Sequence, residues 1–225
     1  MSDLMIKKNN NIIDTELLTQ NQGYTGASKR YIPISSQNVL DTIQQYTGNI
    51  PEIIGFNRMN TRKAEKQHFV QHALMLQMPD AEMLDGTSYN IILFNSNDRS
   101  SSLKIYTGAG LRAACSNQLI FSDNDYQEIK IRHTTQENDW KHSIYGLMDN
   151  YAETQKQTQD MIDRMMNKYM SYSDMDRFAE RVAEEIINPS ITGSILDAKS
   201  LDIAHRKEDI GKNLWLNFNR LQSSM

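Results

Sequence analysis

Short apolar segments alternate with turn-forming residues through the middle of the chain, between residues 50 and 136. Segments of this length that are rich in β-branched and aromatic residues and are bounded by Gly, Pro, Asn or Asp are typical of strands. The connecting segments include Asp85-Gly86, Asn97-Asp98 and Asp123-Asn124, whose residue types favour turns. The pattern therefore predicts a mostly antiparallel sheet, with strands at Ile53–Met59, Phe69–Met78, Tyr89–Phe94, Leu103–Tyr106, Leu111–Phe121 and Glu128–His133.

Helical spacing of apolar residues predicts one helix before the strand-rich segment and further helices after it. The apolar stripes expected on them are Val39, Leu40 and Ile43 in the first; Trp140, Ile144, Leu147, Met148, Tyr151, Ile162, Met165 and Tyr169 in the second; Phe178, Val182, Ile186 and Ile187 in the third; and Leu214, Trp215, Phe218 and Leu221 in the last. The second is one long amphipathic helix, with or without a break at Thr154–Gln159. Ser173 with Asp176 is the expected capping pair of the third.

Strands first and helices afterwards predict an α+β fold, in which a twisted sheet is followed by a C-terminal helical region. We expect residues 1–30, which are polar, to form a flexible N-terminal arm. Residues 31–136 would be the strand-rich core, and residues 137–225 a helical region packed on the sheet. The whole would be a single domain, because 225 residues allow one core with a helical extension.

Composition narrows the class of protein. Hydrophobic residues make up 39% of the chain, which is too much for a disordered protein. The apolar run Ile91–Phe94 is far shorter than the ~20 residues of a membrane helix, and the first residues lack the apolar stretch of a signal peptide. Cys115 is the single cysteine, so no internal disulfide can form. We therefore predict a soluble protein of the cytoplasm with no membrane partner.

The net charge of −4 argues against a generic basic nucleic-acid binder, but the charge is unevenly distributed. Residues 1–136 carry 13 Lys and Arg against 13 Asp and Glu, whereas residues 137–225 carry 11 against 15. Between residues 58 and 72, four cations, namely Arg58, Arg62, Lys63 and Lys66, accompany one acid, Glu65. Nucleic-acid binding would therefore have to be local and confined to the strand-rich part of the chain.

Three arrangements that could carry other chemistry are weak. Gly108-Ala109-Gly110-Leu111-Arg112-Ala113 fits a loose dinucleotide-binding motif, yet a strand-like segment follows it where that motif needs a helix. The glycines would instead allow a tight turn or a bulge.

A catalytic cysteine and a metal site are the two other candidates. Cys115, with Asn117 and His133, could act as a nucleophile only if a base lay within reach of its thiol. His68 and His72 on a strand stand about 13 Å apart, too far for one metal ion. We assign no catalytic residue, metal or cofactor.

Four stretches in order carry a resemblance to a known family. They are Asn95–Ser100, Tyr106–Leu119, Ile131–Thr134 and Asn213–Gln222. Together they resemble the phage/plasmid-like protein family (domain of unknown function 932), over about residues 30–222. Members of that family tend to have His and Gly where this chain has Asn97 and Arg99. The resemblance implies a phage or plasmid context and draws attention to Arg112, Cys115, Asn117, Arg132 and His133.

The resulting hypothesis is an accessory protein that binds single-stranded DNA or RNA for annealing or protection. Arg112 and Arg132 lie in adjacent predicted strands and would project from one sheet face, where cations contact phosphates and rings such as Tyr89, Tyr106 and Phe121 stack on bases. The full set of expected contacts is Arg58, Arg62, Lys63, Lys66, Arg99, Lys104, Arg112, Lys130 and Arg132.

Two alternatives remain open at this point. The first is a non-enzymatic protein that binds a host or phage protein, for which the negative net charge is no handicap. The second is an enzyme built around Cys115 and His133. A homo-oligomer could form through the exposed side of the helix at 137–170 or through an unpaired sheet edge.

Overall fold

The computed structural model of the chain describes residues 13–26, 28–112, 127–185, 207 and 210–224. The chain forms two compact units, residues 1–158 and 159–225. The division between them falls within helix α4 (Tyr151–Asn167).

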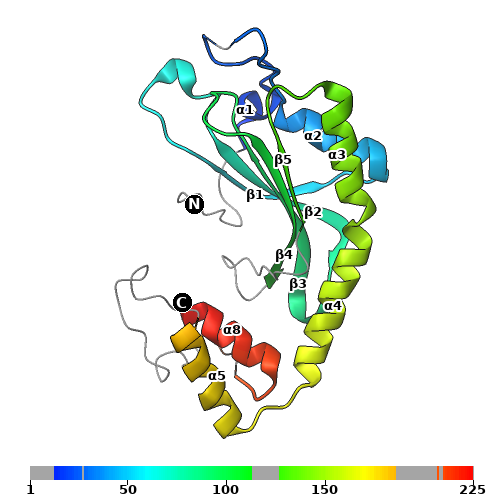
Figure 1. Cartoon of the computed structure of the whole chain (residues 1–225), viewed down its shortest axis with the longest axis vertical. Coiled ribbons are helices and arrows are strands. Elements are labelled where there is room, and N and C mark those ends of the chain that lie inside the picture. The colour runs from blue at the N-terminus through cyan, green and yellow to red at the C-terminus, as the bar shows by residue number, and fades with distance from the viewer. Residues whose placement is uncertain (1–12, 27, 113–126, 186–206, 208–209, 225) are drawn as a thin grey trace. The chain divides into compact units, whose positions relative to one another are not determined.

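The first unit is built on a five-stranded antiparallel sheet in which each strand pairs with the next along the chain (Figure 1). The strands are β1 (Glu52–Arg58), β2 (His72–Glu82), β3 (Thr87–Asn95), β4 (Leu103–Arg112) and β5 (Gln127–Ile131). Helices follow the sheet along the chain, so the predicted α+β class, with an antiparallel sheet before a helical region, is confirmed.

Helices cover one face of this sheet (Figure 1). They are α1 (Thr15–Thr19), α2 (Ser36–Thr47) and α3 (Glu137–Asp149). At the start of α2, the Ser35 hydroxyl accepts a hydrogen bond from the backbone N–H of Asn38, at 3.0 Å. Helix α2 ends at Gly48, whose φ of 74° is a left-handed conformation that glycine adopts without strain. The helix predicted from the stripe of Val39, Leu40 and Ile43 is therefore present.

Strand residues alternate between the two faces of the sheet, and the larger hydrophobic cluster lies on the helix-covered face. Its strand members include Leu74 and Leu76 of β2, Ile91 and Leu93 of β3, and Leu103 and Ile105 of β4. The opposite face holds a separate, smaller cluster of Ile54, Ala73, Met75, Ile92 and Tyr106, with Phe94 packed against it. The sheet therefore has one face built as core and one face that is only partly apolar.

A hairpin joins β2 to β3 at the Asp85-Gly86 turn predicted from the sequence. Asp85 has a φ of 55° and Gly86 a φ of 66°, the left-handed conformations that a tight two-residue turn requires. The backbone N–H of Met83 donates to the carbonyl oxygen of Thr87 at 2.7 Å. Strand β2 runs from His72 to Glu82, so it begins and ends later than the predicted Phe69–Met78.

Strand β4 joins two segments that the sequence pattern separates. The predicted strand at Leu103–Tyr106 continues to Arg112, with Gly108 as an extra residue between Thr107, which pairs with Ile91, and Ala109, which pairs with Asn90. Gly108 has a φ of 97°. The expected bulge is therefore present, whereas the expected separate strand at 111–121 is wrong for its first two residues. Residues 113–121 lie outside the described part of the chain.

The second unit contains the end of α4 together with α5 (Tyr172–Glu185) and α8 (Leu214–Ser224). Helix α5 begins one residue after Ser171, which exchanges hydrogen bonds with Asp174 in a capping box. This corrects the predicted Ser173 and Asp176 pair. Trp215 of α8 is fully buried, and its ring stacks on Phe218 with centroids 6.0 Å apart.

Part of the expected N-terminal arm belongs to the folded unit. Helix α1 buries Leu17 and Leu18 in the main cluster, and Asp14 caps the helix by accepting from the N–H of Leu17. The sequence pattern hid this helix because it is only five residues long. That the helical region packs on the sheet as one domain stays a prediction. Within the described residues, every helix is too short or too polar to traverse a bilayer.

Candidate nucleic-acid interface and adjoining pocket

Eight of the nine predicted cations lie in or beside one end of the sheet. At this end β1 finishes with Arg58 opposite His72, and β4 begins with Leu103 opposite Ile131 at the end of β5. The cations in or just beyond these strand ends are Arg58, Arg62, Lys63, Lys66, Arg99, Lys104, Lys130 and Arg132.

Arg112 is the exception, because it lies nine residues beyond Leu103 in β4, about 30 Å along the strand. Arg132 follows the last residue of β5 at the other end. Arg112 and Arg132 therefore lie at opposite ends of the sheet, and that they project from one face of it stays a prediction. The side chain of Arg112 lies outside the described part of the structure.

Three of these cations hold the fold together. Arg58 forms an ion pair with Asp14 beside α1. The Lys66 ammonium lies 2.7 Å from the carboxylate of Asp98. Arg99 donates to the carbonyl oxygen of Gly26 at 2.6 Å and therefore ties the segment before Tyr31 to the loop after β3. The exposed Arg62, Lys63 and Arg132 remain, together with Lys104 and Lys130 in the sheet.

Lys104 and Lys130 form a direct cross-strand pair in the register of β4 and β5. The same register line continues to Phe94 of β3, which pairs with Lys104, and to Ala73 of β2, which pairs with Phe94. Ala73 and Phe94 belong to the cluster on the face opposite the helices, so this line of side chains lies on that face. Lys104 is partly exposed and Lys130 is exposed. Within the described residues neither ammonium group has an ion-pair partner.

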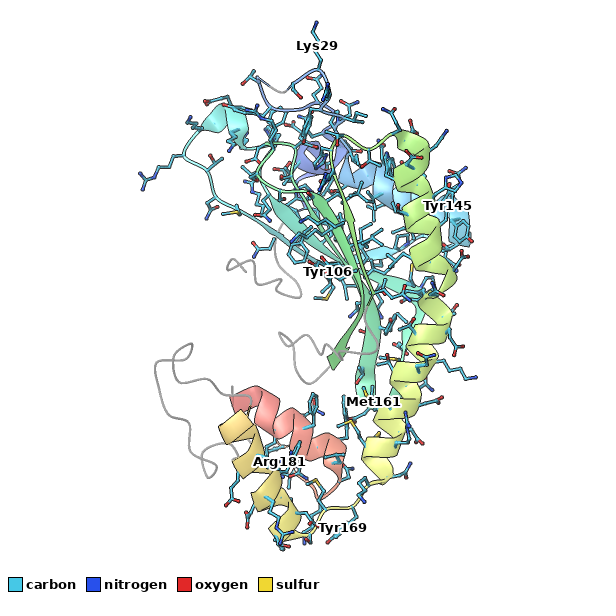
Figure 2. The ribbon with its side chains drawn as sticks, in the orientation of Figure 1. Lys29, Tyr106, Tyr145, Met161, Tyr169 and Arg181 are labelled. Carbon is cyan, nitrogen blue, oxygen red and sulfur yellow. The ribbon has the colours of Figure 1, made fainter. Side chains whose placement is uncertain are left out.

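Tyr106 supports the ring of Phe94 from the neighbouring strand. The two rings are perpendicular, with centroids 5.7 Å apart. The Tyr106 hydroxyl donates to a carboxylate oxygen of Glu128 at 3.2 Å, which fixes the orientation of the ring. Figure 2 shows Tyr106 on the side of the sheet away from α3. Tyr106 is buried, whereas Phe94 is only partly buried and is the ring that this face can offer to a base.

The loop after β3 is folded around the hydroxyl of Ser96. That oxygen accepts from the N–H of Ser101 at 3.1 Å and contacts the hydroxyl groups of Ser100 and Ser101. Asn97 is buried, and its amide donates to the carbonyl oxygen of Gln20 at 2.8 Å. Burial acts to raise the pKa of Asp98, but the hydrogen bonds from Lys66 and Ser100 outweigh it and lower that pKa. The loop is therefore a fixed structure that ends in a row of three serines.

An open pocket of about 470 Å³ lies between this loop and the end of β5. Its lining consists of Gly26, Ser28, Tyr31, Arg99, Ser100, Ser101, Ser102 and His133. Tyr31 stacks on His133, with ring centroids 5.0 Å apart and planes 21° from parallel. Burial, with a smaller contribution from the Asp98 carboxylate, raises the pKa of Tyr31 to about 12. The Tyr31 hydroxyl therefore stays protonated and contacts the carbonyl oxygen of Ser96.

His133 contributes a neutral imidazole to this pocket. Its Nδ1 lies 3.3 Å from the carbonyl oxygen of Ile32, which can only accept, so Nδ1 carries the proton. Burial lowers the pKa of His133, which keeps the ring uncharged at neutral pH. Its Nε2 is then a hydrogen-bond acceptor, and it is buried without a partner among the described residues.

A second histidine, His72, is sealed in the core and plays a structural role. Its Nδ1 contacts the carbonyl oxygen of Val70, and its Nε2 accepts from the Ser36 hydroxyl at 2.7 Å. Asn95 donates to the same hydroxyl oxygen at 3.2 Å. Burial lowers the pKa of His72 to about 4. With His72 and Ser36 both buried, this pair fastens the start of α2 to the end of the sheet. Among the described residues no cluster of ligating side chains could hold a metal ion.

Sequence reasoning missed the pocket, although the resemblance to a family contained a signal for it. The stretches Asn95–Ser100 and Ile131–Thr134 are distant in sequence, yet the pocket takes Arg99 and Ser100 from the first stretch and His133 from the second. Tyr31 carried no signal of its own. The proposed partners Cys115 and Asn117 lie outside the described residues.

Comparison with known proteins gives one positive result. No curated protein and no solved structure is significantly similar to this chain. The sequence profile of one family, described as Domain of unknown function (DUF932), matches residues 25–225. That match covers most of the chain and confirms the resemblance carried by its four ordered stretches. The chain therefore belongs to the family Domain of unknown function (DUF932).

Proposed function

We propose that the protein binds single-stranded nucleic acid on the sheet face that carries Phe94, Lys104 and Lys130. The observation that carries this proposal is the direct pairing of the two lysines across β4 and β5. Like charges directly opposite each other destabilise a sheet, and among the described residues no carboxylate pairs with either lysine. A bound phosphate backbone would remove this repulsion, because it supplies the missing negative charge.

The neighbouring ring makes the site suitable for a single strand rather than a duplex. Phe94 adjoins Lys104 on the next strand and is held edge-on by Tyr106. Proteins that bind single strands combine cations for the phosphates with aromatic rings on which bases stack. An antiparallel sheet places such side chains about 5 Å apart on one face. The exposed Arg62, Lys63 and Arg132 at the same sheet end would extend the path of the strand.

The net charge of −4 limits the interaction to this local surface. We expect a modest, salt-sensitive affinity with little sequence preference, which suits strand annealing or protection in a phage or plasmid context. Binding to a host or phage protein, self-association and a place in the cytoplasm stay predictions.

Fluorescence anisotropy with a labelled single-stranded oligothymidylate and a matched oligouridylate tests the proposal between 50 and 300 mM salt, a range of roughly sixfold. We expect affinity to fall steeply as salt rises, with a slope near 0.7 for each phosphate contact. Lys104→Gln and Lys130→Gln should each weaken binding and reduce that slope by about 0.7. Lys156→Gln, at an exposed position on α4, is the matched charge control.

Phe94→Leu separates stacking from charge, because leucine keeps an apolar side chain and removes the ring. We expect weaker binding with an unchanged salt slope, since stacking contributes about 1–3 kcal/mol per base. Lys104→Gln and Lys130→Gln relieve repulsion, so a loss of binding in these variants would not come from unfolding. Salt-independent binding, or equal affinity in all four variants, would refute the proposal.

A further inference from the structure

The pocket lined by Tyr31, Arg99, Ser102 and His133 is distinct from the sheet face and combines two kinds of binding group. One is a guanidinium that suits an anion. The other is a buried imidazole acceptor that suits a hydroxyl. Its volume of about 470 Å³ falls within the range of sites for small molecules.

Arg99 has hydrogen-bonding capacity to spare. A guanidinium carries five N–H donors, and the described contacts use one for the carbonyl oxygen of Gly26 and one for that of Thr25. The acid next to it in the chain, Asp98, forms an ion pair with Lys66 at 2.7 Å. The surroundings of the pocket therefore favour a negatively charged ligand.

His133 supplies the second requirement. It is 6% exposed, and its buried Nε2 has no partner within the described residues. A buried acceptor without a donor costs about 1–3 kcal/mol, so a donor supplied by a ligand would stabilise the complex. Because the ring is neutral, the Nε2 atom would not attract the anionic group itself. It calls for an O–H or N–H donor on the same ligand.

The serines complete a polar wall between these two groups. Ser100 and Ser101 direct their hydroxyl groups to Ser96. Ser102 has no hydrogen-bond partner among the described residues, so its hydroxyl can donate to an anion. The ring of Tyr31 stacks on that of His133 and supports it.

We infer that this pocket binds the sugar phosphate part of a nucleotide, with the phosphate on Arg99 and Ser102 and a sugar hydroxyl on Nε2 of His133. A sugar phosphate carries an anionic group and hydroxyl donors a few ångströms apart, so one molecule can meet both requirements. The inference does not rest on the sheet-face proposal, because Phe94, Lys104 and Lys130 do not line the pocket.

Ribose 5-phosphate is the probe, with inorganic phosphate as the comparison, and isothermal titration calorimetry on the full chain gives both affinities. We expect ribose 5-phosphate to bind at least about tenfold more tightly than inorganic phosphate. Equal affinity for the two, or no binding of ribose 5-phosphate at millimolar concentration, would overturn the inference.

Two variants test which side chain binds the phosphate and which binds the sugar hydroxyl. Arg99→Gly removes the guanidinium at a position with a φ of 71°, where glycine is unstrained, and should weaken both ligands at least about tenfold. His133→Phe keeps a ring against Tyr31 and should reduce the affinity for ribose 5-phosphate to that for inorganic phosphate. Lys156→Gln is the control. Unchanged ribose 5-phosphate affinity in either pocket variant would contradict the assignment.

Nitrogen NMR of the imidazole rings gives a readout that a purely structural role would not produce. Ribose 5-phosphate should shift the Nε2 resonance of His133 and leave that of the exposed His142 unchanged. A shift of both rings, or of neither, would count against a hydrogen bond to His133. This experiment is independent of the oligonucleotide assay, because ribose 5-phosphate has no base to stack and only one phosphate.

Discussion

Lys104 of β4 lies directly opposite Lys130 of β5, and both side chains lie on the sheet face opposite α1, α2 and α3. Replacing one lysine by an acid converts a repulsive pair into an attractive one. We expect Lys130→Glu to raise the free energy of unfolding relative to Lys130→Gln by about 0.2–1 kcal/mol at low salt. Urea denaturation measures the difference, which should largely vanish near 1 M salt, where the Debye length is about 3 Å. A difference that persists there would show that charge is not its origin.

Acid should destabilise the fold through His72. Its folded-state pKa of about 4 lies below the ordinary 6.5, so the unfolded chain takes up the proton first as the pH falls. Stability is therefore full above pH 6.5 and declines toward pH 4, by about 3 kcal/mol from this group. The lowered pKa of His133 acts in the same direction. Urea denaturation from pH 7.5 to 4.5 should show this decline, with a shallower slope in His72→Gln. Equal slopes would contradict the prediction.

The conformation of Arg99 predicts an unusual order of substitutions. Its φ of 71° disfavours residues with a Cβ by roughly 1–2 kcal/mol. Arg99→Ala loses the hydrogen bonds to Thr25 and Gly26 and keeps this strain, whereas Arg99→Gly loses the same bonds and removes it. We therefore expect the glycine variant to be more stable than the alanine variant by about 1 kcal/mol. Thermal unfolding of the two variants gives the comparison, and the reverse order would exclude backbone strain at this position.

Two glycines should respond to alanine in opposite ways. Gly108 occupies the bulge in β4 with a φ of 97°, so Gly108→Ala should destabilise the first unit by about 1 kcal/mol or more. Gly146 is exposed within α3, where an added Cβ would meet nothing within 4 Å. Gly146→Ala should therefore stabilise the helix by about 0.5–1 kcal/mol. Chemical denaturation followed by circular dichroism compares both with the parent.

Serine substitutions can locate the start of α5. The Ser171 hydroxyl accepts from the backbone N–H of Asp174 and donates to the Asp174 carboxylate. Ser171→Ala removes both hydrogen bonds and should lower the stability of the helix by about 0.5–2 kcal/mol. Ser173 lies inside the helix, and Ser173→Ala should change little. Hydrogen exchange of the α5 amides measures local stability in both variants. Faster exchange in Ser173→Ala alone would instead support Ser173 and Asp176 as the capping pair.

The fold was predictable where a local rule decides the conformation. The pair Asp85 and Gly86 predicts a tight turn, because few other residue types accept left-handed φ values. Both residues adopt such values in the structure. The stripe around Trp140 and Ile144 identified α3 because its buried face follows the helical period. At Gly108 the local rule allowed a tight turn or a bulge, and it could not tell whether one strand or two surrounds this residue. That depends on the pairing with Asn90 and Ile91, which only the assembled sheet determines.

The candidate site was less predictable because sequence lists charges without their partners. Arg58 and Lys66 looked like free cations, yet Asp14 and Asp98, which are distant along the chain, pair with them. The strand register shows two of the cations that lack an acidic partner among the described residues, because it places Lys104 opposite Lys130. The pocket depends on Tyr31 and His133 meeting across the fold, which no spacing rule contains. The left-handed φ of Arg99 was equally hidden, because nothing in its residue type announces that conformation.

The order of the sheet, in which every strand binds its successor, also determines how the first unit can assemble. Each strand pairs with the strand before it, so only the loop between the two has to close. The conformational entropy that the chain loses in closing each loop therefore stays small. During synthesis the sheet can grow from β1 toward β5 as the chain emerges. Helix α3 is made only after β5, so Trp140 and Ile144 join the apolar cluster after all five strands have been made. A nascent chain that stops before α3 therefore leaves part of this face open to aggregation or to a chaperone.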